Sequence, residues 1–359
     1  MKEKLLEIIR CPVTGTELTL NNAMVENGEI KTATLTSSDG RYSYPVINYI
    51  PRLMTDSNNY SQSWGKLWGE TAAILRDSYT GEQFHEETLF GEYGGEDNDG
   101  VGSPFGFNWP RDLTGQRVLE IGCGTGNFTE LLYTTGAELL SIDMSTAVDT
   151  LPSEVVLHPN VNVVQTDINT PSIVRNYFDK IWLFQVLQHT PVPADTLVTM
   201  RELLRENGVI AFTSYGGSIR YNPLSYRVIK KIPPNIQWAL ISLLTPALVR
   251  LKYWLRVPFT RESFVYKVVT KLLYVADPRD IYIRVRRREL NDYHFAKYYF
   301  RTGDHDYLIK FVVLNTFDRI TPEYTNNASH EMIEDWLSDA GYSSFETWGK
   351  GGVRASAVK

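Results

Sequence analysis

The 359-residue sequence has few features that would tie it to a membrane, a metal or an oxidising compartment. Only two cysteines occur, Cys11 and Cys123, which excludes a disulfide framework and a cysteine-rich metal site. No run of about twenty apolar residues is present to span a membrane. The first apolar stretch is too short and too charged for a secretory signal. With 43% apolar and 22% charged residues, the composition is that of a globular protein, which we expect in the cytoplasm.

Charge is distributed unevenly along the chain. The net charge is −6, yet residues 216–310 contain 18 Lys or Arg and only 7 Asp or Glu. Such a split can mark a surface for an anionic partner. A solvated basic segment that faces the acidic remainder of the protein explains it equally well, so both interpretations stay open.

The most informative segment is residues 118–126, Val-Leu-Glu-Ile-Gly-Cys-Gly-Thr-Gly. Its apolar residues predict a buried parallel strand, and its alternating glycines let the backbone turn tightly and approach a ligand. A helix is predicted from Asn127, with Gly136 at its end. A second apolar strand at 139–142 is followed by Asp143, where an acid can accept hydrogen bonds from ribose hydroxyls.

The glycine spacing discriminates between nucleotide ligands. A dinucleotide site has Gly-x-Gly-x-x-Gly and a pyrophosphate at the helix N-terminus. This loop reads Gly-x-Gly-x-Gly, with Asn127 where the last glycine of the dinucleotide pattern would fall. Glu120, two residues before the first glycine, would repel a pyrophosphate but suits a cationic ligand. The loop therefore favours a cofactor with positive charge and no phosphate.

This arrangement resembles motif I of the class I methyltransferases, whose cofactor, S-adenosyl-L-methionine, carries an ammonium and a sulfonium. The resemblance implies that Asp143 binds the ribose, that Asp167 binds the adenine amino group beside Ile168, and that Gln185 and Val186 line the methionine end. For Asp167 the alternative is a helix cap. The expected cofactor-binding residues are Glu120, Gly122, Cys123, Gly124, Gly126, Asn127, Asp143, Met144, Asp167, Ile168, Gln185 and Val186.

The pattern from 116 to 215 alternates strands and helices, as a parallel sheet requires. Near the C-terminus, Ser329 opens an amphipathic helix that ends at Gly341. The fold class that we predict is α/β, a Rossmann-like class I methyltransferase sheet with a small N-terminal β-rich domain and a helical lid insertion. Expected elements are strands at 161–165, 180–186 and 209–215, a helix at 195–206 ended by Gly208, and a hairpin of 345–348 and 353–358.

Four regions are expected from this pattern. Turn residues Asn21-Asn22, Asn27-Gly28 and Asp39-Gly40 predict small hairpins near the N-terminus. The intervening region is rich in aromatic residues and predicts one or two helices that lead into the first strand. The resemblance implies that such a helix folds over the cofactor, and the alternative is that the aromatic residues only pack the domain junction. The regions are an N-terminal domain (1–54), a helical linker or cofactor-capping segment (55–115), the methyltransferase domain (116–215 and 328–359) and the lid insertion (216–327).

The N-terminal region resembles the small zinc-ribbon-like domain that is fused to, or partners, some methyltransferases. Metal-binding members of that group have a Cys-Pro-x-Cys pair, but here Cys11 and Pro12 are followed by Val13 and Thr14. One thiol cannot build a structural zinc site, which needs about four nitrogen or sulfur ligands. We therefore expect no bound metal and a buried, structural Cys11.

The insertion at 216–327 is too long for a plain loop. An apolar helix around 237–255 would supply walls for a substrate. Four arginines, Arg284, Arg286, Arg287 and Arg288, would supply positive charge. An acceptor with an apolar body and an anionic group would match both features, for example a phosphate- or carboxylate-bearing metabolite, or a lipid-linked sugar at a membrane surface. The alternative is that these arginines pair with acids of the main domain.

Methyl transfer mainly requires that a nucleophile is held in line with the methyl carbon. A hydroxyl nucleophile gains from a nearby base, and His189, just after the fourth predicted strand, could take a proton near pH 7. His189 could instead only order its loop, and Tyr215 is a weaker catalytic candidate. The segments 185–191 and 315–324 also resemble a group of bacterial or archaeal two-part methyltransferases.

Three functions are open at this stage. The first is a small-molecule methyltransferase that acts on oxygen. The second is an RNA or protein methyltransferase that holds phosphates with the basic insertion. It is disfavoured because Phe184-Gln-Val-Leu stands where amino-group methyltransferases have an Asn-Pro-Pro-Tyr-like signature. The third is a non-catalytic subunit that binds S-adenosyl-L-methionine. The sequence indicates neither the acceptor nor the oligomeric state.

Overall fold

The structure is a computed structural model, and its described residues form two compact units. Unit 1 comprises Met1–Ser61, His85–Ile219 and Tyr324–Lys359, and unit 2 comprises Gln62–Phe84 and Arg220–Glu323. The structure describes residues 1–55, 65, 69, 74–91, 106–170, 172–216, 231–233, 236–243, 298–299, 301–320, 322–349 and 352–359.

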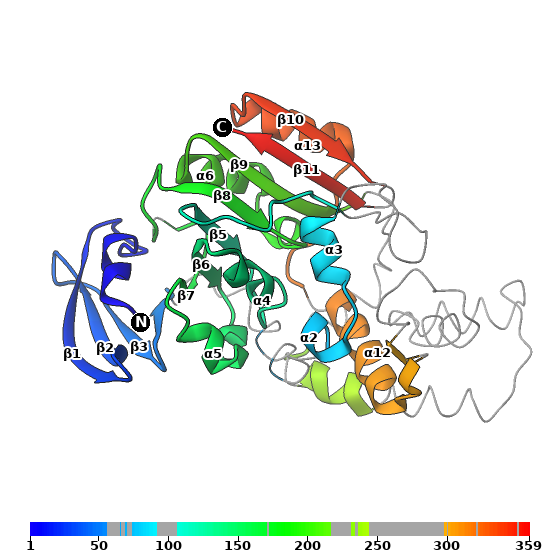
Figure 1. The fold of residues 1–359 in the computed structure, drawn as a ribbon, viewed down its shortest axis with the longest axis horizontal. Helices are drawn as coiled ribbons and strands as arrows, with labels where there is room; N and C mark the ends of the chain where they lie inside the picture. The colour runs from blue at the N-terminus through cyan, green and yellow to red at the C-terminus, as the bar shows by residue number, and fades with distance from the viewer. Residues whose placement is uncertain are drawn as a thin grey trace, which may run out of the picture. The chain divides into compact units, whose positions relative to one another are not determined.

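Unit 1 is built on one sheet that runs from N-terminal hairpins to a C-terminal hairpin (Figure 1). The spatial order is β1-β2-β3-β4-β7-β6-β5-β8-β9-β11-β10. The strands are β1 (Leu18–Glu26), β2 (Glu29–Ser37), β3 (Ser43–Ile47), β4 (Ile50–Leu53), β5 (Arg117–Ile121), β6 (Glu138–Asp143), β7 (Val161–Thr166), β8 (Phe178–Leu183), β9 (Leu204–Tyr215), β10 (Ser344–Trp348) and β11 (Gly352–Val358).

The strands from β4 to β9 are parallel, and β11 and β10 complete the sheet in antiparallel pairing. From β5 the chain moves through β6 to β7 on one side and later returns to β8 and β9 on the other. The strand order therefore reverses between β5 and β8. In open α/β sheets, ligands bind at such a switch point, outside the carboxyl ends of the strands. The α/β class and the Rossmann-like sheet predicted from the sequence are confirmed.

Alternating apolar side chains of the parallel strands pack on both faces of the sheet. Leu119 and Ile121 belong to one buried cluster, which also contains residues of α6 and α13. Val118 belongs to the other cluster, with residues of α3, α4 and α5. The helices of unit 1 are η1 (Glu3–Glu7), α3 (Phe84–Phe90, which starts one residue before the unit), α4 (Thr129–Leu132), η3 (Tyr133–Thr135), η4 (Thr146–Thr150), α5 (Ser153–Val156), η5 (Leu187–His189), α6 (Pro193–Leu203) and α13 (His330–Asp339).

The N-terminal strands continue the main sheet. Strand β4 pairs in parallel with β7, with Arg52 opposite Gln165 and Leu53 opposite Thr166. An isolated bridge joins Ile9 to Ile173, and buried N-terminal residues share one apolar cluster with the parallel strands. Residues 1–54 therefore share both a sheet and a core with the residues that follow.

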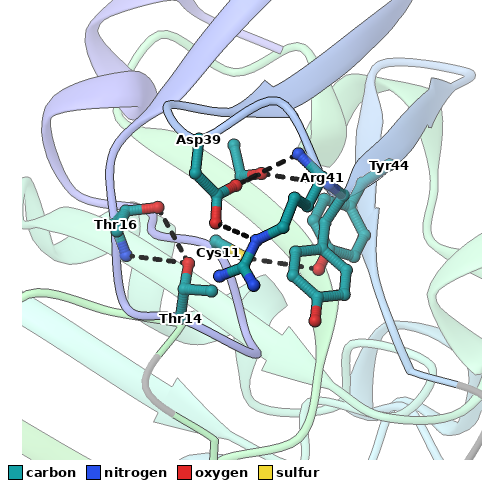
Figure 2. A network of polar contacts seen from close by, with 8 residues as sticks. Cys11, Thr14, Thr16, Asp39, Arg41 and Tyr44 are labelled. Atoms are coloured by element: carbon teal, nitrogen blue, oxygen red, sulfur yellow. Dashed lines mark hydrogen bonds and ion pairs between the residues drawn. The ribbon is translucent and has the colours of Figure 1, made fainter.

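Polar contacts lie beside the N-terminal strands, at the turn after Cys11 and at the β2–β3 connection (Figure 2). The Cys11 thiol lies 3.3 Å from the Tyr44 hydroxyl. Burial alone would raise the pKa of this thiol, but hydrogen bonds with Thr14 and Tyr44 outweigh burial and lower the pKa. Asp39 accepts hydrogen bonds from the backbone N–H and the Nε of Arg41. The first contact connects Cys11 with β3, and the ion pair of Asp39 and Arg41 lies within the β2–β3 connection.

Several local predictions can be compared with the structure. The hairpin turns at Asn27-Gly28 and Asp39-Gly40 are confirmed, because they connect β1 to β2 and β2 to β3. The predicted turn at Asn21-Asn22 is wrong. These residues form an irregularity inside β1, where Asn22 has φ 53° and the pairing register shifts. A left-handed residue fits a bulge as well as a turn, so the sequence pattern did not distinguish them.

The predicted helix at 195–206 is also partly wrong. Helix α6 ends at Leu203, and Leu204 is already extended and pairs with Phe178 in the neighbouring strand. Gly208 therefore lies within β9 and does not terminate the helix. The predicted C-terminal helix is confirmed, since Ser329 Oγ accepts a hydrogen bond from Met332 N at the start of α13. The C-terminal hairpin is confirmed as β10 and β11.

Unit 2 is helical in its described residues. Helix α12 (His305–Ile320) and the helical residues 236–243 share an apolar core. Helix α2 (Asp77–Thr80) belongs to the first chain segment of the same unit. Arg301, in the second chain segment of the unit, donates a hydrogen bond to the carbonyl of Thr80. Of the predicted helix at 237–255, residues 244–255 lie outside the described residues, as do Arg284, Arg286, Arg287 and Arg288. Across the parts of the chain that the structure describes, no helix has the length and apolarity needed to cross a membrane.

Candidate functional site

The predicted cofactor residues lie at the carboxyl ends of four neighbouring strands of unit 1. The glycine loop (Gly122–Gly126) follows β5, and Asp143 ends β6. Asp167 follows β7, and Gln185 and Val186 follow β8. The sheet topology therefore brings these segments to the edge that contains the switch point between β5 and β8.

All three glycines of the loop have positive φ, at 73° for Gly122, 52° for Gly124 and 90° for Gly126. A Cβ added at Gly122 would overlap Val186 Cγ2, and one at Gly126 would overlap Leu151 Cδ2. At Gly122 and Gly126, a side chain is thus disfavoured by the backbone conformation and also by close neighbours. The loop is therefore compact and presents its backbone at the strand ends.

Asp143 binds the glycine loop directly. Its Oδ2 accepts a hydrogen bond from Gly124 N at 2.8 Å, and its Oδ1 accepts from Ser145 N and Ser145 Oγ, both at 2.7 Å. Burial raises the pKa of Asp143, and these three hydrogen bonds partly offset that rise. Asp143 therefore holds the loop in shape from the neighbouring strand, besides its predicted role toward a ribose. Ser145 was not among the predicted site residues, although an acid two residues before a serine is a common local pairing.

Glu120 lies beneath the loop. Its side chain is 2% exposed, and Oε2 accepts hydrogen bonds from Thr129 Oγ1 and Ser141 Oγ, both at 2.7 Å. Burial raises the pKa of Glu120 to about 7, and the charge of Asp143 adds to the effect. The carboxyl is consequently half-protonated near neutral pH, whereas the sequence analysis treated it as a full anion. Its hydrogen bonds connect β6 and α4 under the loop, and Thr129 and Ser141 were missed because their role requires the folded contact.

Other residues of the loop region have local roles. Asn127 Oδ1 accepts a hydrogen bond from Thr125 Oγ1 at 3.2 Å. The Cys123 thiol is buried, and burial together with the charges of Glu120 and Asp143 raises its pKa well above the ordinary value. The thiol is therefore protonated at neutral pH. Met144 is half-buried, and its carbonyl accepts a hydrogen bond from Gln165 Nε2 at 3.1 Å.

Asp167 is buried at the end of β7. Its Oδ1 accepts hydrogen bonds from Asn169 N at 2.9 Å and Asn169 Nδ2 at 3.2 Å, and its carbonyl accepts from Thr170 Oγ1. The neighbouring Ile168 is 6% exposed. This is a turn stabilised by an acidic side chain, close to the capping alternative weighed from the sequence. The acid and the apolar residue remain the candidates for the adenine end.

The segment after β8 is the turn Gln185–Thr190, which we call the β8 turn. Strand β8 ends at Leu183, three residues before the predicted end, and Gln185 has φ 55°. Its N–H donates to Thr213 Oγ1 at 2.8 Å. The left-handed residue reverses the chain, so that Val186 contacts Gly122 and the side chain of Gln185 is exposed.

His189 lies at the end of the β8 turn, in 3-10 helix η5. Its Nδ1 lies 3.0 Å from the carbonyl oxygen of Tyr324, so Nδ1 carries the proton that this contact requires. Burial lowers the pKa of His189 to about 4, and its ring meets Tyr215 edge-on at 5.6 Å. A neutral, buried imidazole tied to the backbone is suited to ordering its loop. With so low a pKa it would be a weak base at neutral pH.

Helix α3, in the region before the first parallel strand where the sequence predicted helices, packs against a residue just after the glycine loop. Its His85 meets Phe128 edge-on at 4.9 Å, directly after the glycine loop. Phe128 also contacts Trp182 and Phe184, at 4.9 and 4.8 Å between ring centroids. An aromatic cluster therefore supports the start of helix α4 from the side of the pre-sheet segment.

Within the residues that the structure describes, no three His, Cys, Asp or Glu side chains gather as a metal site would require. The acidic and histidine side chains at the cofactor edge are engaged by hydroxyl and backbone groups instead. At this edge, a ligand would meet a compact glycine loop, buried carboxyl groups and the exposed side chain of Gln185.

Comparisons with known proteins agree with this geometry. Residues 100–259 match a protein family described as a methyltransferase domain. The chain is 28% identical over 120 residues to a ubiquinone biosynthesis O-methyltransferase from Pasteurella multocida, covering 30% of this chain and 50% of that protein. It is 30% identical over 117 residues to the protein of the same name from Alkalilimnicola ehrlichii, covering 32% and 46%. The chain thus spans about half the length of the curated relatives it matches.

Among solved structures, an S-adenosylmethionine-dependent methyltransferase from Mesorhizobium loti is 12% identical, with a TM-score of 0.36, covering 70% of this chain and 94% of that one. A TM-score at this level does not establish a common fold. The family match spans the glycine loop, Asp143, Asp167 and the β8 turn. The strand order agrees with the family match, and residues 100–259 of the chain are therefore similar to a methyltransferase domain.

Proposed function

We propose that the protein transfers a methyl group from S-adenosyl-L-methionine to an oxygen atom of a small molecule. The observation that carries the proposal is the cofactor edge, where Asp143 organises the glycine loop and Glu120 lies buried beneath it. The relatives named O-methyltransferases support oxygen as the acceptor atom. In this reaction the bond from sulfur to the methyl carbon breaks as the new carbon–oxygen bond forms. The acceptor hydroxyl loses its proton, and neutral S-adenosylhomocysteine leaves.

The chain's own residues would hold the cofactor in a fixed orientation. Asp143 would accept from the ribose hydroxyls, while Asp167 and Ile168 would meet the adenine. The exposed Gln185 and its neighbour Val186 would line the methionine end. Alignment of the nucleophile with the methyl group accounts for much of the catalysis. The hydrogen bonds that hold the glycine loop, the Asp167 turn and the β8 turn therefore support the proposal.

For proton removal, His189 and Tyr215 remain the candidates. The low pKa of His189 and its contact with the Tyr324 carbonyl favour a positioning role for the imidazole. A basic His189 would give a rate that depends on a group titrating near neutral pH. Glu120 also titrates near pH 7 under the loop, so the pH–rate profile is compared with that of His189→Asn. An inflection that the variant lacks would show a basic His189, and the same profile in both proteins is expected for a positioning role.

Calorimetry with S-adenosylhomocysteine and with a nicotinamide dinucleotide tests the cofactor assignment. We expect binding of the first and none of the second. Binding of the dinucleotide alone would overturn it. Turnover is then measured with methyl-labelled S-adenosyl-L-methionine and two panels of acceptors, one bearing hydroxyls and one bearing amines. Label in amines only would contradict oxygen as the acceptor atom, and label in neither panel would favour a non-catalytic binding role.

We further propose that the insertion at 216–327 acts as a lid over the acceptor. Its excess of basic residues would favour an acceptor with an anionic group, and a lipid-linked acceptor would bring peripheral contact with a membrane. Nucleic acid is not the favoured partner. Replacing Arg286 and Arg287 by alanine should then weaken acceptor binding and leave cofactor binding unchanged.

We also propose that residues 1–54 are a degenerate zinc-ribbon-like domain. Thr14 stands where metal-binding members have a second cysteine, and its hydroxyl lies 2.8 Å from that of Thr16. Together with the contact between Cys11 and Tyr44, these hydrogen bonds would take over the role of a metal in holding the turn. The fold would then persist without zinc, and a chelator should leave the melting temperature unchanged.

A further inference from the structure

A short segment that returns from the insertion binds the β8 turn along its length. We call residues 324–328 the return segment, which begins unit 1 again after unit 2. The carbonyl of Tyr324 accepts from His189 Nδ1, and Asn326 N donates to the carbonyl of Gln188 at 2.8 Å. At the other end, Ala328 N donates to the carbonyl of Tyr215 at 3.0 Å. The return segment therefore connects β9 and the β8 turn by backbone hydrogen bonds.

Asn326 makes a second contact through its side chain. Its Nδ2 donates to the carbonyl of Thr190 at 2.7 Å, although 136 residues separate the two in sequence. One residue thus binds both Gln188 and Thr190 and spans the second half of the β8 turn. A hydrogen bond between residues so far apart in sequence cannot be explained by local turn preference.

The first half of the β8 turn reaches the glycine loop. His189 N donates to the carbonyl of Val186 at 2.8 Å, and Val186 contacts Gly122 so closely that no side chain fits there. A continuous series of contacts therefore connects Asn326 through η5 and Val186 to the first glycine of the loop. Each of these residues lies within unit 1.

We propose that Asn326 is a positioning residue for the cofactor, and that it acts by fixing the β8 turn against the glycine loop. The inference rests on the proposed function, because the loop is the proposed cofactor site. Without the Nδ2 donor, the carbonyl of Thr190 loses this hydrogen bond, and the β8 turn loses one of its three hydrogen bonds to the return segment. Val186 then holds Gly122 less firmly, and the cofactor meets a less ordered loop.

The test measures binding of S-adenosylhomocysteine by calorimetry to the full-length wild type, Asn326→Ala and a matched control, Asn315→Ala. The control removes the same kind of bond, because Asn315 Nδ2 donates to the carbonyl of Phe311 at 2.8 Å within helix α12. We expect Asn326→Ala to weaken binding by about fivefold to tenfold, the usual effect of one lost hydrogen bond. Asn315→Ala should bind within about twofold of the wild type, a difference smaller than one hydrogen bond gives.

A double-mutant cycle separates positioning from a general loss of stability. Val186→Ala interrupts the same series of contacts at its cofactor end. The affinity of the double variant Asn326→Ala, Val186→Ala for S-adenosylhomocysteine should therefore equal that of whichever single variant binds less tightly. Fully additive losses would overturn the inference, as would wild-type affinity in Asn326→Ala. If the alanine variant does not fold, Asn326→Asp keeps the shape, removes the donor and is held to the same expectations. Failure of the wild type itself to bind S-adenosylhomocysteine would instead overturn the proposed function.

Discussion

Two buried titratable groups, Glu120 and His189, should change the free energy of unfolding with pH in opposite directions. Burial raises the pKa of Glu120 from 4.5 to about 7 and lowers the pKa of His189 from 6.5 to about 4. Between pH 4.5 and 7 the folded state holds a proton on Glu120 that the unfolded chain has lost, so this group makes the fold less stable as the pH rises. Between pH 4 and 6.5 the unfolded chain holds a proton on His189 that the folded state lacks, so this group makes the fold more stable.

The size of each effect follows from the pKa values. Each group changes the free energy of unfolding by about 3 kcal/mol across its range, since a pKa difference of one corresponds to about 1.4 kcal/mol. In the wild type the two effects oppose each other over their shared range. Glu120→Gln imitates the protonated carboxyl, so the variant should gain about 3 kcal/mol relative to the wild type between pH 4.5 and 7. His189→Asn keeps a donor for the Tyr324 carbonyl, and its stability relative to the wild type should fall by a similar amount between pH 4 and 6.5.

Urea denaturation in half-unit pH steps at constant ionic strength measures these differences. The contributions of other titrating groups to the free energy of unfolding cancel, because each variant is compared with the wild type at the same pH. Glu7→Gln is the matched control, since it removes a carboxyl that is exposed on η1. A flat difference for Glu120→Gln across this range would refute the reasoning that burial under the loop raises the pKa of Glu120.

Four further outcomes are expected. Gly122→Ala should abolish S-adenosylhomocysteine binding in calorimetry, whereas Gly115→Ala, which has φ 78° and no atom within 4 Å of an added Cβ, should only lower stability by about 1–2 kcal/mol. Asp143→Ala should weaken the same binding by at least about 1–3 kcal/mol, and equal affinity would rule out its predicted role. Gln188 is fully buried, and among the residues that the structure describes neither of its side-chain polar atoms has a hydrogen-bond partner. Gln188→Leu should therefore raise the melting temperature, and a lowered one would show that the amide is satisfied in solution. Because Cys11 has no partner thiol nearby in sequence, elemental analysis of protein purified without added metal should find less than one zinc per chain.

The cofactor edge was predictable from sequence where its contacts are local. The glycine loop, Asp143 and the helix start at Ser329 each depend on residues a few positions apart. A strand, a turn and a helix in order are enough to define them. The sheet topology then brings the strand ends together, whatever the loops between them contain.

Contacts between distant segments were not predictable. The Tyr324 carbonyl that fixes the tautomer of His189 lies 135 residues away. The sequence pattern suggests that Glu120 is an anion, but burial in the folded state raises its pKa, and the hydrogen bonds from Thr129 and Ser141 only partly oppose this rise. Likewise, the early end of β8 depends on Gln185 taking a left-handed conformation, which non-glycine residues adopt uncommonly. Single-sequence patterns contain no signal for any of these features.

The pairing of β4 with β7 has a consequence for how the protein is made. Arg52 is opposite Gln165, so synthesis must continue for 113 residues before β4 meets its parallel partner. During that time the hairpins of β1 to β3 can close locally, but the outer edge of β4 has no strand to pair with. Non-local parallel pairing of this kind is slow and leaves an edge open to other chains. The N-terminal strands must therefore wait for the centre of the sheet, and aggregation during folding is most expected at β4.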